Sequence, residues 1–265
     1  MSMSISIAMV AFDKGAKISR SAVYKHLQAT WPKLPAATAS EKTDSLFSFQ
    51  FGETSIIYGL MPAPIPWSDL EGPCKSSWLW PEASEKMRGH SSHVIVTVAS
   101  DRPPIERQTL LTQATASLVA TTTATAGVYW CGSTLVMAPD MFCDFAIKVM
   151  PESPPLFLWI DFRTGSSKNG EVRGFTNGMR SLGHMELEAL DASETPGGLK
   201  ERFFGLAGYL LENGPVIKDG DTMGEDEDER IQVVYSDSTF GQEEQVMRLV
   251  YEPTKQKKSW WRGRN

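Results

Sequence analysis

The chain contains 265 residues, of which 41% are hydrophobic and 22% are charged, so it can bury a sizeable core as one large domain or two small ones. Its 26 Lys and Arg against 32 Asp and Glu leave a formal net charge of -6. This balance argues against a general nucleic-acid-binding protein, because such a protein needs many cations for phosphate contacts.

Residues 1–10 are apolar, but they form a short stretch without a basic start, which is not typical of a signal peptide. No window of about 18 apolar residues follows, so we expect no membrane span. The three cysteines, Cys74, Cys131 and Cys143, are odd in number and lack CxxC spacing, which is typical of reduced thiols. These features predict a cytoplasmic protein.

The first half begins with a β-branched strand at 4–11 and a helix after Ser19, whose apolar residues recur at helical spacing up to Trp31. Residues 46–51 and 56–61 predict a hairpin around a Gly-Glu turn. We call residues 62–92 the Pro/Trp segment, because prolines punctuate Trp67, Trp78 and Trp80. Leaving three indoles in water is costly, so we expect a packed loop with one short helix and with all three indoles substantially buried.

A β-branched run at 94–99 predicts a buried strand that leads into a helix at 105–126, followed by short strands at 127–132 and 134–137. Two X-Pro steps at 151–155 favour a boundary there. The second half shows strands at 156–162, 183–190, 231–235 and 246–251 and an amphipathic helix at 196–211.

These elements predict an α+β protein made of two ferredoxin-like-type α/β sandwich halves, each with a mostly antiparallel sheet, packed as one compact unit. The expected halves are residues 1–153, which carry the Pro/Trp segment as an insertion, and residues 154–252. A basic tail follows at 253–265, with five cations and two tryptophans. The tail reads either as a frayed solubilising end or as a contact for an anionic partner. The sequence does not predict an oligomeric state.

The sequence contains no GxSxG elbow, no GxxxxGK[ST] phosphate loop, no GxGxxG after a strand and no HExxH helix. We therefore expect a non-catalytic protein without cofactor or metal. One alternative is a hydrolase or metal-dependent enzyme, because His184, Glu186 and Glu188 share one face of the expected strand at 183–190. The commoner interpretation of this row is a solvated or partner-facing surface. His90 and His93 are poor ligand candidates, because they point to opposite faces of an extended segment.

Residues 219–230 resemble a calcium loop, but Met223 and Arg230 occupy positions where oxygen ligands are required. The acidic run, Glu225, Asp226, Glu227, Asp228 and Glu229, is then a solvated turn or a contact for a basic protein partner. We expect the partner-binding role.

The strand at 94–99 with its helix, the strand at 128–130, and the sequences GFTNGM at 174–179, GHMELE at 183–188 and KDGDTMG at 218–224 together resemble the bacterial domain-of-unknown-function family 4261. The resemblance spans roughly residues 92–235 and implies no catalytic residues. Comparable α+β domains occur among bacterial toxin-immunity and secretion-associated proteins, which is an analogy of fold alone. Taken with the residues, it implies a protein-binding module, either an immunity protein or a secretion-system accessory protein.

Overall fold

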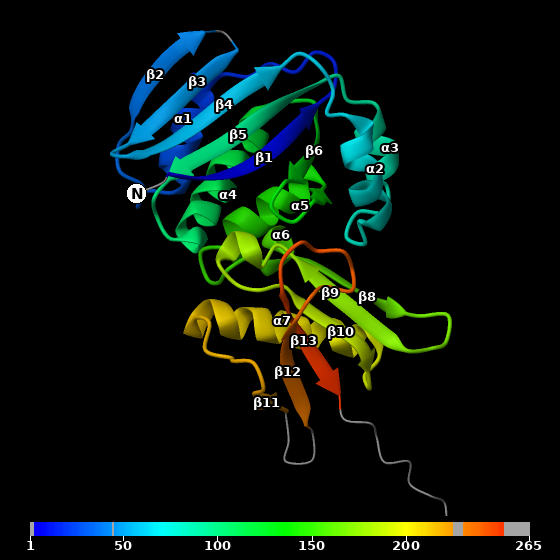
Figure 1. The fold of residues 1–265 in the computed structure, drawn as a ribbon. Helices are drawn as coiled ribbons and strands as arrows, with labels where there is room; N and C mark the ends of the chain where they lie inside the picture. Colours follow the sequence, from blue (N-terminus) through cyan, green and yellow to red (C-terminus); the bar gives the residue numbers. More distant parts are fainter. Residues whose placement is uncertain (1–2, 44, 225–229, 252–265) are drawn as a thin grey trace, which may run out of the picture. The chain divides into compact units, whose positions relative to one another are not determined.

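The computed structural model describes residues 3–43, 45–224 and 230–251. It confirms the α+β class with two mostly antiparallel sheets (Figure 1). The chain divides into two compact units. The first unit runs from the start of the described chain to Asp161 and includes Asn177–His184, and the second contains Phe162–Thr176 and the residues from Met185 onward.

The first unit is built on a seven-stranded sheet with the order β2-β3-β4-β5-β1-β6-β7, in which every neighbouring pair is antiparallel. The strands are β1 (Ser4–Phe12), β2 (Thr38–Thr43), β3 (Leu46–Phe51), β4 (Thr54–Met61), β5 (Ser92–Ser100), β6 (Thr125–Trp130) and β7 (Leu135–Met137). The β-branched run of the sequence becomes the central strand β5, whose Val94, Val96 and Val98 are buried.

Helices α1 (Arg20–Thr30) and α4 (Pro104–Thr121) cover one face of this sheet. Tyr58 of β4 points to this face and donates its hydroxyl to the Ala114 carbonyl of α4 at 3.2 Å. Ser19 caps α1 through the backbone N–H of Ala22, as the sequence pattern predicts. The remaining helices of the unit are α5 (Pro139–Asp144), a π-helical turn (Phe145–Val149), α6 (Leu156–Trp159) and a 3-10 turn (Arg180–Leu182).

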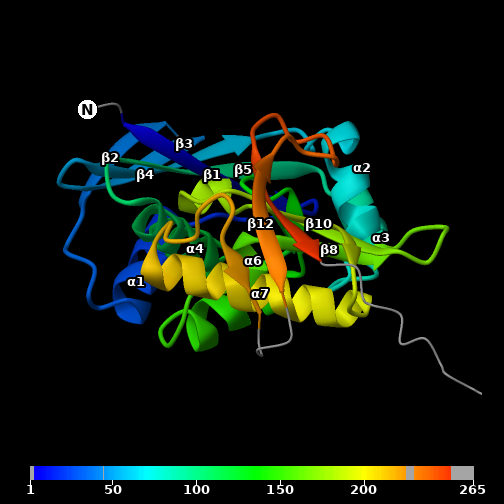
Figure 2. The same cartoon turned by 60° about the horizontal axis from the view of Figure 1, so that its bottom comes forward.

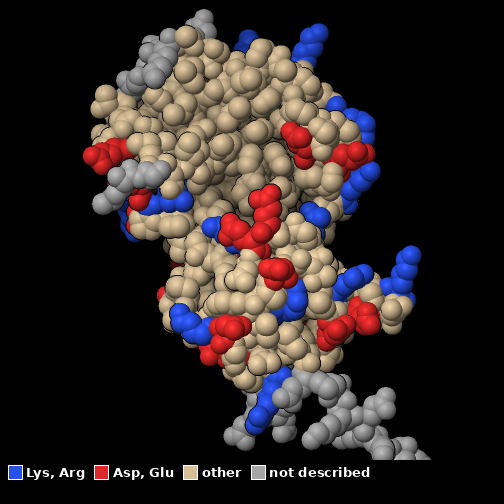
Figure 3. Space-filling model, viewed as in Figure 1, with Lys and Arg blue, Asp and Glu red and all other residues tan. Residues whose placement is uncertain are grey.

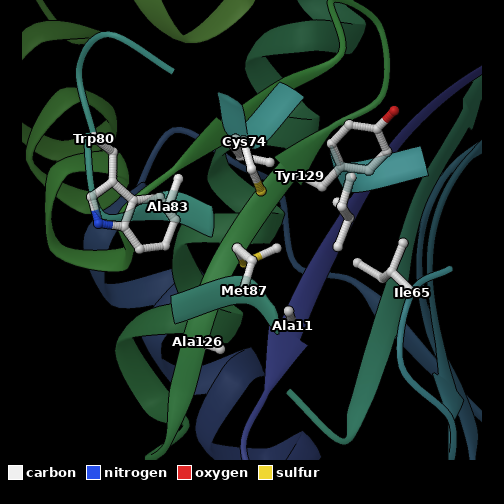
Figure 4. Packing of buried hydrophobic residues seen from close by; sticks show 10 residues of the cluster. Ala11, Ile65, Cys74, Trp80, Ala83, Met87, Ala126 and Tyr129 are labelled. Carbon is white, nitrogen blue, oxygen red and sulfur yellow. The ribbon is translucent and has the colours of Figure 1, made fainter. Parts of the chain in front are cut away.

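Part of the opposite face is covered by the Pro/Trp segment, which forms two short helices rather than one, α2 (Trp67–Ser76) and α3 (Ala83–Arg88). Figure 4 shows Trp80, Cys74, Met87 and Ile65 packed with Ala11 and Tyr129 of the sheet. Gly127 permits this close approach, because a Cβ there would lie 2.4 Å from the Met87 sulfur and 3.0 Å from the Trp80 ring.

The three indoles of this segment differ in burial. Trp80 is only 8% exposed, as predicted. Trp67 is partly buried, with the Arg88 guanidinium 4.1 Å from its ring centre. The expectation for Trp78 was wrong, because this residue is 45% exposed; its ring makes an edge contact with the Phe157 ring.

The second unit has a six-stranded sheet with the order β11-β12-β13-β10-β9-β8, in which β10 and β13 pair in parallel. Figure 2 labels three of these strands, β8, β10 and β12, together with helix α7 of the same unit. The strands are β8 (Asp161–Ser166), β9 (Val172–Asn177), β10 (Leu187–Ala192), β11 (Thr222–Met223), β12 (Ile231–Ser236) and β13 (Val246–Tyr251). Helix α7 (Pro196–Asn213) is capped by Thr195 and ends before Gly214, which has a φ of 78°. It buries the predicted stripe of Leu199, Phe203, Leu206 and Leu210.

Three elements differ in type or in bounds from those predicted from the sequence. Residues 156–159 form a helical turn rather than a strand, because the preceding prolines hold the chain in a turn in which the Leu158 N–H donates to the Pro155 carbonyl at 2.8 Å. Helix α4 ends at Thr121, before Ala124 turns the chain with a φ of 60°. The strand expected from residue 183 begins at Leu187, because Gly183 ends a 3-10 turn with a φ of 89°.

Candidate functional site

A groove with a volume of about 480 Å³ lies in the second unit between α7 and residues 217–224, and we call it the α7 groove. Its lining comes from two short stretches of sequence: Glu201, Arg202, Gly205, Leu206 and Tyr209 on α7, and Ile217, Asp221, Thr222, Met223 and Gly224 opposite. Tyr209 is 49% exposed, whereas Leu206 is buried. The groove therefore offers an apolar floor and an accessible aromatic ring, with carboxylates nearby.

The α7 wall follows from the amphipathic pattern of the helix. Gly205 and Tyr209 are four residues apart, so they lie one turn apart on the same side of α7, next to the buried stripe. A Cβ at Gly205 would meet no atom within 4 Å, so the absence of a side chain leaves open space there. Arg202 is held by an ion pair with Glu194, which also accepts a hydrogen bond from the Tyr251 hydroxyl at 2.9 Å.

The opposite wall is fixed to β12 by backbone hydrogen bonds. The Gly220 N–H donates to the Val233 carbonyl, and the Val233 N–H donates to the Asp221 carbonyl, both at 2.8 Å. The Tyr235 hydroxyl donates to the Ile217 carbonyl. Partial burial of Tyr235, and then the nearby Asp219 and Asp221 carboxylates, raise the pKa of this hydroxyl, so it stays a donor at neutral pH.

The two acids that open the calcium-like sequence serve this wall. Asp219 accepts the Tyr235 N–H at 2.7 Å, and Asp221 accepts the Lys218 N–H at 2.7 Å. Both carboxylates thus stabilise a turn.

The acidic run, Glu225 to Glu229, and the basic tail, 253–265, lie outside the described residues. The residues that flank the acidic run are described. Gly224, just before it, lines the α7 groove, and Ile231, just after Arg230, begins β12.

The structure does not contain the predicted open row of His184, Glu186 and Glu188. Glu186 and Glu188 lie in the second unit and are 2% and 0% exposed, so the interpretation of a solvated or partner-facing row was wrong for them. His184 belongs to the first unit, ahead of the strand, where its backbone N–H donates to the Met179 carbonyl at 3.0 Å. Partial burial lowers the pKa of its imidazole.

The two buried glutamates have specific partners within the second unit. Glu188 accepts hydrogen bonds from the Ser238 hydroxyl, from the Thr239 N–H at 3.1 Å and from the Arg248 guanidinium at 3.3 Å. Glu186 accepts from the Thr176 hydroxyl at 2.7 Å. These contacts fix the segment after β12 against the sheet, so Glu188 acts as a structural anchor.

The other candidate ligands also have structural roles. His90 accepts the Ile65 N–H at 2.7 Å and so links two parts of the Pro/Trp segment to each other. His93 of β5 hydrogen-bonds the Ala63 carbonyl at 2.8 Å and so ties the segment to the sheet. The three cysteines are free, and burial raises the thiol pKa of Cys131 to about 12 and of Cys74 to about 11. Within 3–43, 45–224 and 230–251, no three His, Cys, Asp or Glu residues are placed to hold a metal ion. In the same part of the chain, no helix combines the length and apolar character needed to span a membrane.

A family model described as domain of unknown function (DUF4261) matches residues 175–250. This segment is DUF4261-like. The match confirms the resemblance predicted from the sequence for this part of the chain, and it extends to Val250 in β13. Every residue that lines the α7 groove lies inside the DUF4261-like segment. No curated protein and no solved structure matches the chain.

Sequence reasoning did not single out Gly205 and Tyr209. The helical pattern separates the buried stripe from the remaining positions, but a groove also needs a second wall, which residues 217–224 supply from beyond the end of the helix. The sequence feature that could have indicated the groove is a glycine and a tyrosine one helical turn apart, next to the buried apolar stripe of α7.

Proposed function

We propose that the chain is a protein-binding module that uses the α7 groove to hold an apolar or aromatic side chain of a basic protein partner. The observation that carries this proposal is the position of the groove, which lies entirely within the DUF4261-like segment. An apolar depression with an accessible tyrosine at its edge is the kind of surface that receives a partner's anchoring side chain.

The charge near the groove favours a basic partner. Glu201 and Asp221 line the groove and are exposed. The acidic run follows Gly224 directly in the sequence, and residues 219–230 contain seven acids and one arginine. Such a concentration of negative charge would attract a basic surface over roughly one Debye length and speed its association.

The cellular role that we propose is that of a cytoplasmic bacterial protein that neutralises a toxin or assists a secretion system. This part of the proposal rests on analogy with α+β domains of that kind. Either role requires binding to another protein, so both make the same prediction for the α7 groove.

Affinity purification from the native host, with this chain as bait and with mass-spectrometric quantification, tests the proposal. Gly205→Gln should place a side chain in the groove without a clash, since a Cβ there meets no atom within 4 Å. Gly72→Gln is the matched control, because Gly72 also lies within a helix and also has open space around its Cβ.

We expect the same basic protein to be recovered with the wild-type chain and with the Gly72→Gln control. Its recovery should fall by about tenfold or more with Gly205→Gln, equivalent to about 1.4 kcal/mol of binding free energy. Equal recovery with both variants would place the binding surface elsewhere, and recovery of the bait alone would count against a protein-binding role.

A further inference from the structure

Strand β11, which consists of Thr222 and Met223, forms one edge of the six-stranded sheet and also lines the α7 groove. It pairs with β12 on one side, where Thr222 lies opposite Gln232. In the described part of the chain, no strand pairs with its other side. Helix α7 and the open edge of β11 therefore border the same groove (Figure 1).

The hydrogen bonds to β12 indicate which way the backbone of Thr222 points. Val233 of β12 donates its N–H to the Asp221 carbonyl, and its own carbonyl accepts the Gly220 N–H, both at 2.8 Å. Bonding to one neighbour recurs at every second residue of an antiparallel strand, so the adjacent Gln232 turns its backbone groups toward β13. Thr222, opposite Gln232, therefore turns its N–H and carbonyl toward the open edge. Thr222 is exposed, so the backbone of a partner can reach both groups.

The side chains around this edge favour a basic partner segment. Glu201 on α7 and Asp221 on the opposite wall line the groove and are exposed. The cation in the lining, Arg202, is already paired with Glu194. In Figure 3, red acidic and blue basic side chains both lie on the visible face of the second unit, so the negative charge of the groove is a local feature. An arginine in a bound segment would meet carboxylates on both walls.

We propose that the partner binds the α7 groove through an extended segment that adds as a further strand beside β11. This inference rests on the proposed function and names the form of partner that the groove accepts. The Thr222 N–H would donate to a carbonyl of the segment, and the Thr222 carbonyl would accept one of its N–H groups. Side chains alternate along a strand, so an apolar residue and the residues two positions before and after it would face the groove together. Arginines at those flanking positions would lie on the side of Glu201 and Asp221.

The short length of β11 limits which segments can add to it. Of its two residues, Thr222 turns its backbone groups outward, so main-chain hydrogen bonds alone hold a segment weakly. Short edge strands also discourage unselective strand pairing. Binding therefore requires the apolar side chain and the cations as well. We expect a basic segment with an apolar centre to bind, and an arbitrary extended chain not to bind.

Isothermal titration calorimetry of the full chain with the peptide acetyl-Arg-Val-Phe-Val-Arg-amide tests this inference. The order of residues in the peptide is the same in both directions, so the test needs no assumption about strand direction. Two N-methylated forms are compared, one methylated at Phe and the other at both Val residues, because only alternate N–H groups of an added strand face its neighbour. One form should bind like the unmodified peptide, and the other should bind about tenfold more weakly or worse. The peptide with Glu in place of Arg should lose a similar factor.

Thr222→Pro tests the same contact from the side of the protein. It removes the outward N–H at an edge position, where a sheet tolerates proline. The unmodified peptide should bind this variant about tenfold more weakly or worse, whereas Gly72→Gln should keep the wild-type affinity. Circular dichroism checks the fold of both variants. If Thr222→Pro does not fold, the methylated peptides still decide, because they need no variant of the chain.

Equal affinities of the two methylated peptides would overturn the inference, and so would no binding of the unmodified peptide at about 1 millimolar. Capture of the native partner separates this result from the proposed function. A basic partner whose recovery falls with Gly205→Gln but not with a folded Thr222→Pro would overturn strand addition alone. Recovery of the bait alone would count against the proposed function, whereas a difference between the methylated peptides would still support strand addition at β11.

Discussion

Trp80 and Trp78 lie two residues apart, yet their side chains have very different environments. Trp80 is 8% exposed and packs with Met87 against the backbone of Gly127, whereas Trp78 is 45% exposed. Trp80→Ala should lower the free energy of unfolding by about 3 kcal/mol or more, because it removes buried area and leaves a cavity. Trp78→Ala should lower the free energy of unfolding by about 1 kcal/mol or less. Urea unfolding of both variants checks this, and equal losses would show that the cluster does not depend on Trp80.

The composition of the Pro/Trp segment predicts that its indoles pack, but not which of them is buried. Short helices broken by prolines have no sustained period, so the orientation of Trp78 could not be read from spacing. For Glu186 and Glu188, period-two reasoning does not predict that residues about 50 positions further along the chain, Ser238 and Thr239, hold Glu188. Burial of a polar side chain by a distant segment leaves no local pattern.

Elements with strong local signals were predictable. Helix α7 combines a capping Thr195, Pro196 in its first turn, a regular apolar stripe and Gly214 beyond its end, and the structure contains all of these features. Strand β2, with the polar sequence TASEKT, lacks any such signal and was not predicted. In β9, Gly174 interrupts the strand pattern, although a close approach requires it, since a Cβ there would lie 2.5 Å from the Arg163 carbonyl oxygen.

The contact between the Pro/Trp segment and β5 should make stability depend on pH. Burial lowers the pKa of His93 below its usual value of 6.5, with a smaller contribution of the same sign from His90, although the hydrogen bond to Ala63 opposes them. Burial also lowers the pKa values of His26 and His184. The folded chain therefore binds these protons less readily than the unfolded chain, so the stabilisation is complete above about pH 6.5 and is lost as the pH falls.

Thermal unfolding between about pH 7.5 and about pH 5.5 measures this effect. The melting temperature should fall as the pH falls, and the decrease should be smaller in His93→Gln, which lacks this titrating group. A melting temperature that is constant across this range, or a decrease of equal size in the variant, would show that His93 does not contribute.

At the scale of the whole molecule, the α+β class follows from the alternation of strand and helix signals, and the structure confirms it. The strand order does not follow, because pairing of distant strands depends on tertiary packing. The parallel pair of β10 and β13, which are separated in the sequence by α7, β11 and β12, is one example. The α7 groove depends on the same long-range arrangement, since its second wall is held by β12.

Association kinetics of the captured partner test the central claim, that the α7 groove holds a basic protein and that the acidic run steers it. Replacing Asp226, Glu227 and Asp228 by the corresponding amides should slow association and flatten its salt dependence, because it removes charge. Gly205→Gln should instead speed dissociation, because it fills the groove. Association and dissociation rate constants that are unchanged in both the triple amide variant and Gly205→Gln would contradict the account. The account predicts that, of the three variants, the Gly72→Gln control alone keeps the wild-type rate constants.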